Sequence, residues 1–109
     1  MIMKIRKVGP KEVERVQWWL MWCDFPNLNW ARLRVFTDGS ADVFDMDGRT
    51  ARFSNEEEAM NSLAEDEYSE LRTLDEEDER DLGVPLVSIT PPIGTSDEEL
   101  IPQMYVKVE

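Results

Sequence analysis

Hydrophobic and polar residues alternate over residues 30–37, and the same alternation returns after each of two Asp-Gly pairs, at 38–39 and 47–48. Side chains on a strand point alternately to its two faces, and Asp-Gly supplies the positive backbone angles that a tight hairpin turn requires. The pattern therefore predicts three antiparallel strands between residues 30 and 53, joined in chain order as a β-meander.

The register of these strands follows from the turns. Both turns are expected to contain two residues, which sets Phe44 opposite Leu33 on one side and opposite Ala51 on the other. We prefer this register because a slip of one residue would bring the carboxylate of Asp45 against Leu33. One face of the meander is then apolar and the other cationic. The apolar face is predicted to hold Ala31, Leu33, Val35, Phe44, Met46, Ala51 and Phe53, and the cationic face Arg32, Arg34 and Arg52.

An acidic helix is predicted directly after the meander. Ser54 and Glu57 have the spacing of a capping box, in which the hydroxyl accepts a hydrogen bond from a backbone N–H of the first turn. Apolar residues recur at helical spacing from Met60 to Leu71, so this helix can cover the apolar face of the meander. The predicted fold class is therefore α+β, an antiparallel β-meander of three to four strands with acidic helices packed on one face.

Residues 12–23 fit either of two structures. A helix begun by Pro10 would align Val16 with Leu20, whereas a strand would place Val16 and Trp18 on one face. We favour the strand because crowded aromatic residues suit a pleated surface. Four further short elements are expected after the main helix. They are a helix over residues 75–82 closed by Gly83, an extended edge segment over 84–90, a helical turn capped by Ser96 and Glu99, and a final strand over 105–108.

Charge is distributed unevenly along the 109 residues, which are enough for a single domain, residues 1–109. Residues 1–53 carry nine Lys and Arg against seven acids, whereas residues 54–109 carry three against seventeen, which together give the net charge of −12. An acidic chain repels nucleic acid and anionic surfaces and suits a basic partner. The longest apolar run, residues 18–23, is too short to span a membrane, and a single cysteine suits a reducing compartment. We therefore expect a soluble cytoplasmic protein.

The residue types argue against an enzyme. Histidine is absent, which removes the commonest general base and the commonest metal ligand. Cys23 has no activating base beside it and is expected to be a small buried hydrophobe. Residues 45–48 match the middle of an EF-hand loop, but Val43 and Ser54 occupy two positions where that loop needs a carboxylate. We expect no catalytic residue, no cofactor and no specific metal site.

The tryptophans are the most suggestive feature. Trp18, Trp19, Trp22 and Trp30 lie within thirteen residues, and if Trp18 and Trp22 point inward, Trp19 must point outward. An exposed tryptophan beside arginines is typical of an interface hot spot. The alternative is that the chain's own helices cover both faces of the sheet. The predicted interaction residues are Trp19, Trp30, Arg32, Arg34 and Arg52, and the predicted acidic face holds Glu57, Glu58, Glu65 and Asp66.

The segment from Trp30 to Arg49, with Phe53 and residues 65–68, resembles small uncharacterised proteins of cyanobacteria. The resemblance covers about residues 13–83 and implies no activity. Two functions are therefore expected from the residues themselves. The first is a small, non-enzymatic interaction or regulatory protein, with a homodimer through the outer face of the sheet as one form. The second is an acidic decoy, an antitoxin-like inhibitor that occupies the basic surface of an enzyme or a DNA-binding protein.

Overall fold

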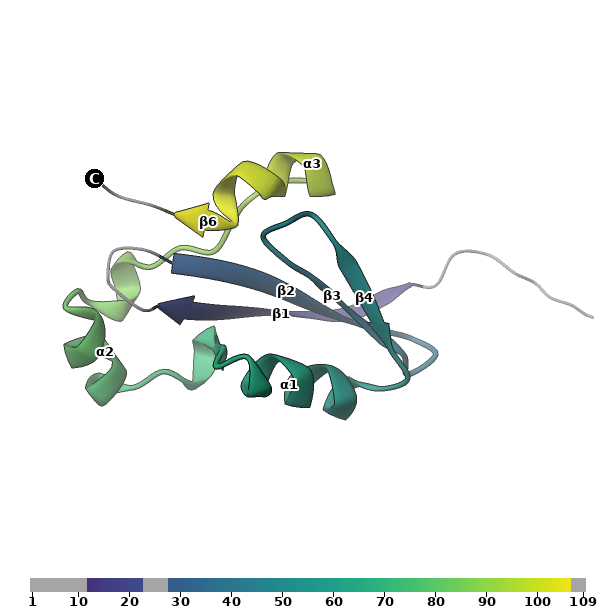
Figure 1. The fold of residues 1–109 in the computed structure, drawn as a ribbon, viewed down its shortest axis with the longest axis horizontal. Helices are drawn as coiled ribbons and strands as arrows, with labels where there is room; N and C mark the ends of the chain where they lie inside the picture. The colour runs from purple at the N-terminus through teal and green to yellow at the C-terminus, as the bar shows by residue number, and fades with distance from the viewer. Residues whose placement is uncertain (1–11, 23–27, 107–109) are drawn as a thin grey trace, which may run out of the picture.

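A computed structural model of the chain describes residues 12–22 and 28–106, and its centre is one antiparallel sheet (Figure 1). The strands lie in the order β4-β3-β2-β1-β5, and β6 pairs with β2. Their bounds are β1 Val13–Trp22, β2 Leu28–Phe36, β3 Ala41–Phe44, β4 Thr50–Phe53, β5 Ser69–Glu70 and β6 Tyr105–Val106. The α+β class, the antiparallel meander and the strand preferred for residues 12–23 are confirmed, although the sheet has more strands than expected.

Within the described residues, three α-helices and three short 3-10 turns accompany the sheet. The helices are α1 Glu56–Glu65, α2 Glu76–Leu82 and α3 Asp97–Leu100, and the turns are η1 Leu71–Thr73, η2 Leu86–Ser88 and η3 Ile101–Gln103. Figure 1 shows α1 along one side of the sheet, α3 on the opposite side and α2 beyond the ends of β1 and β2. The helices therefore cover both faces of the sheet, where the sequence had predicted one.

The register expected for the meander is wrong by one residue at both turns. Leu33 lies opposite Val43, and Phe44 lies between Arg32 and Thr50. The reason is that both loops contain three residues, 37–39 and 46–48, closed by the bonds Phe36 N to Ser40 O and Asp45 N to Arg49 O. In each loop the glycine is the third residue and has a positive φ, the arrangement of a type I turn followed by a left-handed residue.

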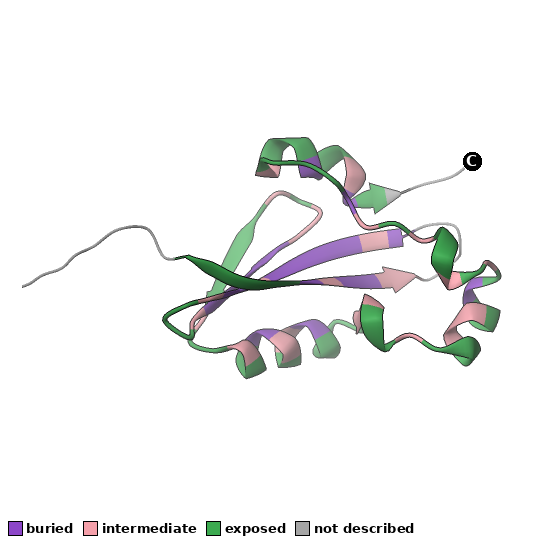
Figure 2. Cartoon of the chain, turned by 180° about the vertical axis from the view of Figure 1, so that it is seen from behind, coloured by how far each residue is buried: buried purple, intermediate pink, exposed green. Residues whose placement is uncertain are grey.

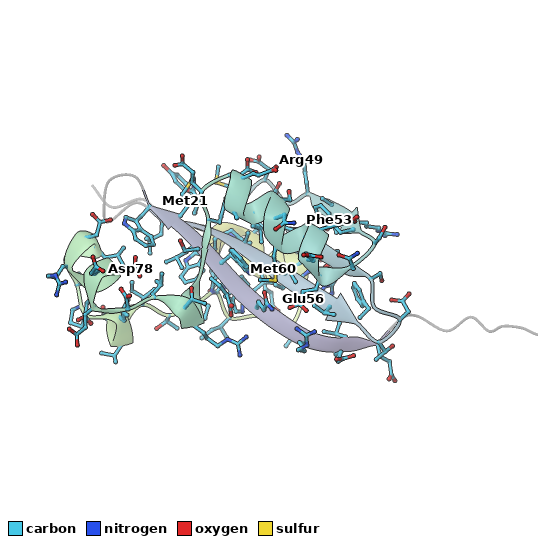
Figure 3. All side chains as sticks on the ribbon, turned by 90° about the horizontal axis from the view of Figure 1, so that it is seen from below. Met21, Arg49, Phe53, Glu56, Met60 and Asp78 are labelled. Atoms are coloured by element: carbon cyan, nitrogen blue, oxygen red, sulfur yellow. The ribbon has the colours of Figure 1, made fainter. Side chains whose placement is uncertain are left out.

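The shifted register divides the core between the two faces of the sheet. Phe44 and Met46, expected beside Leu33, belong to the opposite face. Under α1 the core consists of Trp19, Ala31, Leu33, Val35, Ala41, Val43, Ala59 and Leu63, with Phe53, Met60 and Tyr68 packed against it. Figure 3 looks onto this side of the sheet, with Met60 labelled on α1 and Phe53 on β4. The core on the α3 face consists of Leu20, Leu28, Trp30, Phe44, Leu82, Leu100 and Met104.

The acidic helix α1 begins one residue later than the sequence suggested. Asn55, not Ser54, is the N-cap, and its side chain accepts a hydrogen bond from Glu58 N at 2.9 Å. Glu58 Oε1 in turn accepts from Ser54 N at 3.2 Å. The helix ends at Glu65, earlier than the apolar spacing predicted, because Glu67 turns the chain with a positive φ of 69°.

The C-terminal elements agree with the sequence except for residues 84–90. The capped helix α2 and its closing Gly83, the Ser96–Glu99 capping box and the strand at Tyr105–Val106 are confirmed. Residues 84–90 form no strand, because Leu86 N donates to Glu79 Oε2 at 2.7 Å and the segment turns into η2. The expectations for Cys23 and for residues 107–108 lie outside the described residues.

Candidate interaction site

Trp19 lies on the face opposite to the one where it was expected. Its side chain packs under α1 with only 6% of the residue exposed, and Nε1 donates to Gln17 Oε1 at 3.0 Å. The expectation of an exposed Trp19 is therefore wrong, because β1 has a covered layer on each face. Trp19 is therefore not part of an exposed contact surface.

Trp30 and Arg32 do lie on the predicted outer face, but α3 and the segments around it cover that face. Trp30 is 1% exposed and packs edge-on against Trp18, with ring centroids 6.1 Å apart. Arg32 Nη1 donates to Asp97 Oδ1 at 2.9 Å, and its guanidinium lies 5.0 Å from the centre of the Phe44 ring. These two residues therefore form an interior layer and cannot act as an open contact surface in this structure.

A row of charges crosses the same face where the helices leave it open. Arg34 on β2 lies opposite Asp42 on β3, and Asp42 lies opposite Arg52 on β4. Arg34 Nε and Nη2 donate to the two carboxylate oxygens of Asp42 at 3.0 and 2.7 Å, and these bonds raise the pKa of Arg34 further above its usual value. Arg52 is exposed and makes no ion pair with any residue that the structure describes.

An apolar groove lies beside this row, on the α3 face. Val13 and Val16 on β1 form one side and are 43% and 44% exposed, and Ile93, at 73% exposed, forms part of the other. The groove has a volume of about 520 Å³. It is lined by Val13, Val16, Trp18, Arg32, Arg34, Pro92, Ile93, Gly94 and Leu100.

A β-bulge brings both valines to this face. Val13 pairs with Phe36 and Arg15 with Val35, so β1 has one extra residue at Glu14. Without that residue, Val13 and Val16 would point to opposite faces, since their positions differ by an odd number. The bulge therefore creates an apolar stripe at the beginning of β1.

The beginning of β1 is also an open strand edge. On the side away from β2, β1 pairs with β5 only at Trp19 and Leu20. Residues 13–18 have no partner strand there within the described part of the chain, and we call them the open edge of β1. Figure 2 shows the first part of this edge, residues 13–16, as exposed, whereas the neighbouring β2 is buried along most of its length. An unpaired row of backbone N–H and C=O groups is a template for another strand.

The α1 side of the open edge is held in place by a polar network. Arg15 Nη1 and Nη2 donate to the two oxygens of Glu56 at 2.7 and 2.8 Å, and Gln17 Nε2 donates to Glu56 at 2.6 Å. These bonds lower the pKa of the Glu56 carboxyl, and the bond from Arg15 is the largest cause. The network links the edge strand to the first turn of α1, where Figure 3 labels Glu56.

Arg32 is the one polar side chain of the groove whose hydrogen-bonding needs are not met. Its Nε and Nη2 are buried and have no partner among the described residues. Arg34, two residues further along β2, uses the same two atoms to hold Asp42. A buried donor without an acceptor costs about 1–3 kcal/mol, so such atoms in a stable protein call for an explanation.

The predicted acidic residues are exposed and do not converge on one site. Glu57, Glu58 and Glu65 lie on the surface of α1, and Asp66 follows it. Asp66 lines a second pocket of about 210 Å³ with Asp45, Asp47 and Tyr68. Burial, followed by the charges of these three aspartates, raises the pKa of Tyr68. No group of three or more acidic or cysteine side chains in the described residues is placed to hold a metal ion.

Comparisons with known proteins add no family to this picture. No protein-family model matches the chain, and neither a curated protein nor a solved structure matches it. The resemblance to cyanobacterial proteins therefore stays a prediction. No helix in the part of the chain that the structure describes has the length and apolar character to cross a bilayer.

Sequence reasoning missed the residues that form this site. Val13, Val16 and Ile93 were given no role, although each is an apolar side chain exposed beside a groove. The bulge at Glu14 that aligns the two valines leaves no signal in the hydrophobic pattern, which reads as a regular strand. The Pro91–Gly94 segment did carry a signal, because an isoleucine between breakers has no helix or strand of its own to pack into.

Proposed function

We propose that this protein is a non-catalytic protein-interaction module, and that it pairs with a second copy of itself through the open edge of β1. The observation that carries this proposal is the absence, among the described residues, of a partner for residues 13–18 of the longest strand. Strand addition at such an edge gives affinity through main-chain hydrogen bonds, and neighbouring side chains give specificity.

The side chains of the edge are complementary to a second copy. Two copies related by a two-fold axis pair antiparallel, as in isologous dimers. When that axis passes between Glu14 and Arg15, Glu14 of each copy faces Arg15 of the other, and Val13 faces Val16. The bulge puts both valines on the groove side, so the two apolar stripes join across the axis. Cross-strand pairs of this kind each stabilise a sheet by about 0.2–1 kcal/mol.

The net charge opposes this association and gives it a distinctive salt dependence. Each copy carries −12, so two copies repel one another at long range. Salt screens that repulsion between charges more than a Debye length of about 8–10 Å apart, while the main-chain hydrogen bonds of a shared sheet are little affected. Self-association is therefore expected to become tighter as the salt concentration rises.

Sedimentation equilibrium of the wild-type chain tests the proposal. The average mass is expected to approach that of two chains at high protein concentration. The dissociation constant of the dimer is expected to fall as the salt concentration rises. Val16→Lys places two like charges near the axis and is expected to weaken the dimer at least about tenfold. Val87→Lys is the matched control, because Val87 is 94% exposed on η2 and does not line the groove. A monomer at every concentration, or equal effects of the two substitutions, would refute the proposal.

A second candidate function uses the acidic surface instead of the edge. The exposed carboxylates of Glu57, Glu58, Glu65 and Asp66 support the decoy role, in which the chain occupies a basic surface. Binding to immobilised poly-lysine, used as the probe, is expected to weaken steeply as salt rises, the opposite sign to self-association. Replacing the four carboxylates by their amides should weaken the capture. Capture that is insensitive to salt would exclude this role.

A further inference from the structure

The geometry points to a binding site for an aliphatic monocarboxylate in the groove on the α3 face, with the carboxylate held by Nε and Nη2 of Arg32. This inference goes beyond the proposed dimer and does not depend on it. It rests on the unpartnered donors of Arg32, on the apolar lining of the groove and on the way in which Arg34 binds Asp42.

Arg32 is fixed in place before any ligand arrives. Its position on β2 is 8% exposed, one side of its guanidinium bonds Asp97, and its flat face lies on the Phe44 ring. The remaining edge, Nε and Nη2, is the fork that matches the two oxygens of a carboxylate. A side chain held this firmly loses little conformational freedom when it binds, which favours affinity.

The same protein shows how this fork is used. Arg34 Nε and Nη2 bind Oδ1 and Oδ2 of Asp42 at 3.0 and 2.7 Å. Arg32 has the same two donors and no such acceptor among the described residues. A single carbonyl oxygen would leave one of the two donors without a good partner, so a carboxylate satisfies the site best.

The rest of the groove fits a hydrocarbon chain. Apart from Arg32 and Arg34, its lining consists of valine, isoleucine, leucine, proline, glycine and the Trp18 ring. Its volume of about 520 Å³ lies within the range of about 300–1,000 Å³ typical of small-molecule sites. A ligand with a polar head and an apolar body would therefore find both of its parts matched.

Ligand entry requires a shift of the groove wall, because Nε and Nη2 of Arg32 are buried. Residues 92–94 lie outside the helices and strands, and Gln103 holds them through its side chain. Gln103 Nε2 donates to Ile93 O at 2.7 Å, and Ile93 N donates to Gln103 Oε1 at 2.9 Å. Among the described residues, the wall is thus held by side-chain bonds of Gln103, and we infer that its displacement admits the ligand to the Arg32 fork.

Titration with octanoate tests the inference on the wild-type chain. Calorimetry measures the affinity, and a change in tryptophan fluorescence that is lost in Trp18→Phe reports the location, because Trp18 lines the groove. Octanoate is expected to bind at least about tenfold more tightly than octan-1-ol or octanamide, which share its chain length but are uncharged and have a single oxygen. Equal binding of the three compounds, or no binding of octanoate at millimolar concentration, would overturn the inference.

Substitutions then assign the preference to Arg32. Arg32→Met is expected to remove the difference between octanoate and octan-1-ol, whereas Arg72→Met, at an exposed ion pair elsewhere, should leave it unchanged. Arg32→Lys keeps the positive charge near Asp97 but lacks the fork, so it should lose most of the preference even if Arg32→Met does not fold. If a folded Arg32 variant still bound octanoate more tightly than octan-1-ol by the wild-type factor, the inference would be overturned. Sedimentation measures the dimer and the octanoate titration measures the ligand site, so the two proposals can fail independently.

Discussion

Arg34 and Asp42 show how a single ion pair is tied to the register of the sheet. Asp42 is almost fully buried, and the two side chains meet only because β2 and β3 are joined by a three-residue loop. The two-residue turn expected from the sequence would have set Arg34 opposite Val43. In that register a buried carboxylate would have had no cation beside it, at a cost of several kcal/mol.

Removing this pair is expected to destabilise the protein. Asp42→Asn keeps the shape of the side chain but loses its charge, and we expect a loss of about 2–3 kcal/mol in the free energy of unfolding, measured with urea. Glu70→Gln removes a similar bond to Arg72, whose side chain is 72% exposed, and is expected to cost at most about 1 kcal/mol. Equal losses for the two substitutions would show that the Asp42 pair is not the buried contact described here.

Glu56 is expected to make stability depend on pH. Its folded pKa is lowered, chiefly by the hydrogen bond from Arg15. A carboxyl with a lowered folded pKa contributes stability above its unfolded pKa of about 4.3, and this contribution is lost as the pH falls through the folded pKa. The difference in unfolding free energy between the wild type and Glu56→Gln should therefore be largest near neutral pH and shrink below about pH 4. A difference that grew in acid would contradict the assigned network.

The control for this pH dependence is Glu57→Gln. Glu57 is exposed in the same helical turn and makes no side-chain hydrogen bond or ion pair with any described residue. Both carboxylates feel the helix dipole, so a difference between the two substitutions isolates the bonds of Glu56 to Arg15 and Gln17.

At the scale of elements, the sequence pattern predicted that a helix follows β4 but not which residue caps it. The acidic run and the apolar spacing located the helix, but Ser54 and Asn55 are both good N-caps and adjacent in the sequence. Asn55 takes the position because β4 extends to Phe53 and its pairing with Ala41 fixes where the chain leaves the sheet.

A pair of alanine substitutions tests this assignment. Asn55→Ala is expected to cost about 1 kcal/mol of stability, because Glu58 N loses its acceptor. Ser54→Ala should change stability by less than about 0.5 kcal/mol, since Ser54 takes part through its backbone N–H. Thermal unfolding of the two variants under the same conditions provides the comparison. A larger loss of stability for Ser54→Ala than for Asn55→Ala would show that Ser54 is the N-cap, as the sequence predicted.

The loops and the groove explain why the site itself could not be predicted. Asp-Gly marks both hairpins in the sequence, but the same pair fits a two-residue turn or the end of a three-residue loop. The choice reversed the face on which Phe44 lies. The bulge at Glu14 and the packing of α3 over Arg32 depend on contacts between distant segments. Local patterns therefore located most of the strands and helices, whereas the exposure of Trp19 and Arg32 was decided by tertiary packing.

At the scale of the whole molecule, one sheet carries a covered layer on each face, and the beginning of β1 and the outer side of the short strand β4 have no partner strand among the described residues. The charge asymmetry seen in the sequence survives as an acidic surface on α1, whereas the arginines of β2 are drawn into ion pairs with Asp42 and Asp97. The outer face therefore does not present the cationic patch that the sequence suggested. What remains for recognition is the beginning of β1 and the groove beside it.

Amide hydrogen exchange, followed by NMR at low and high protein concentration, tests this account most directly. We expect exchange to slow on concentration at alternate amides of residues 13–18, because antiparallel pairing bonds every second residue of an edge. Amides of α2 and of β4 should exchange at the same rate in both samples. Slowing confined to other elements, or no change along residues 13–18 under conditions where the mass doubles, would contradict the open edge as the contact surface.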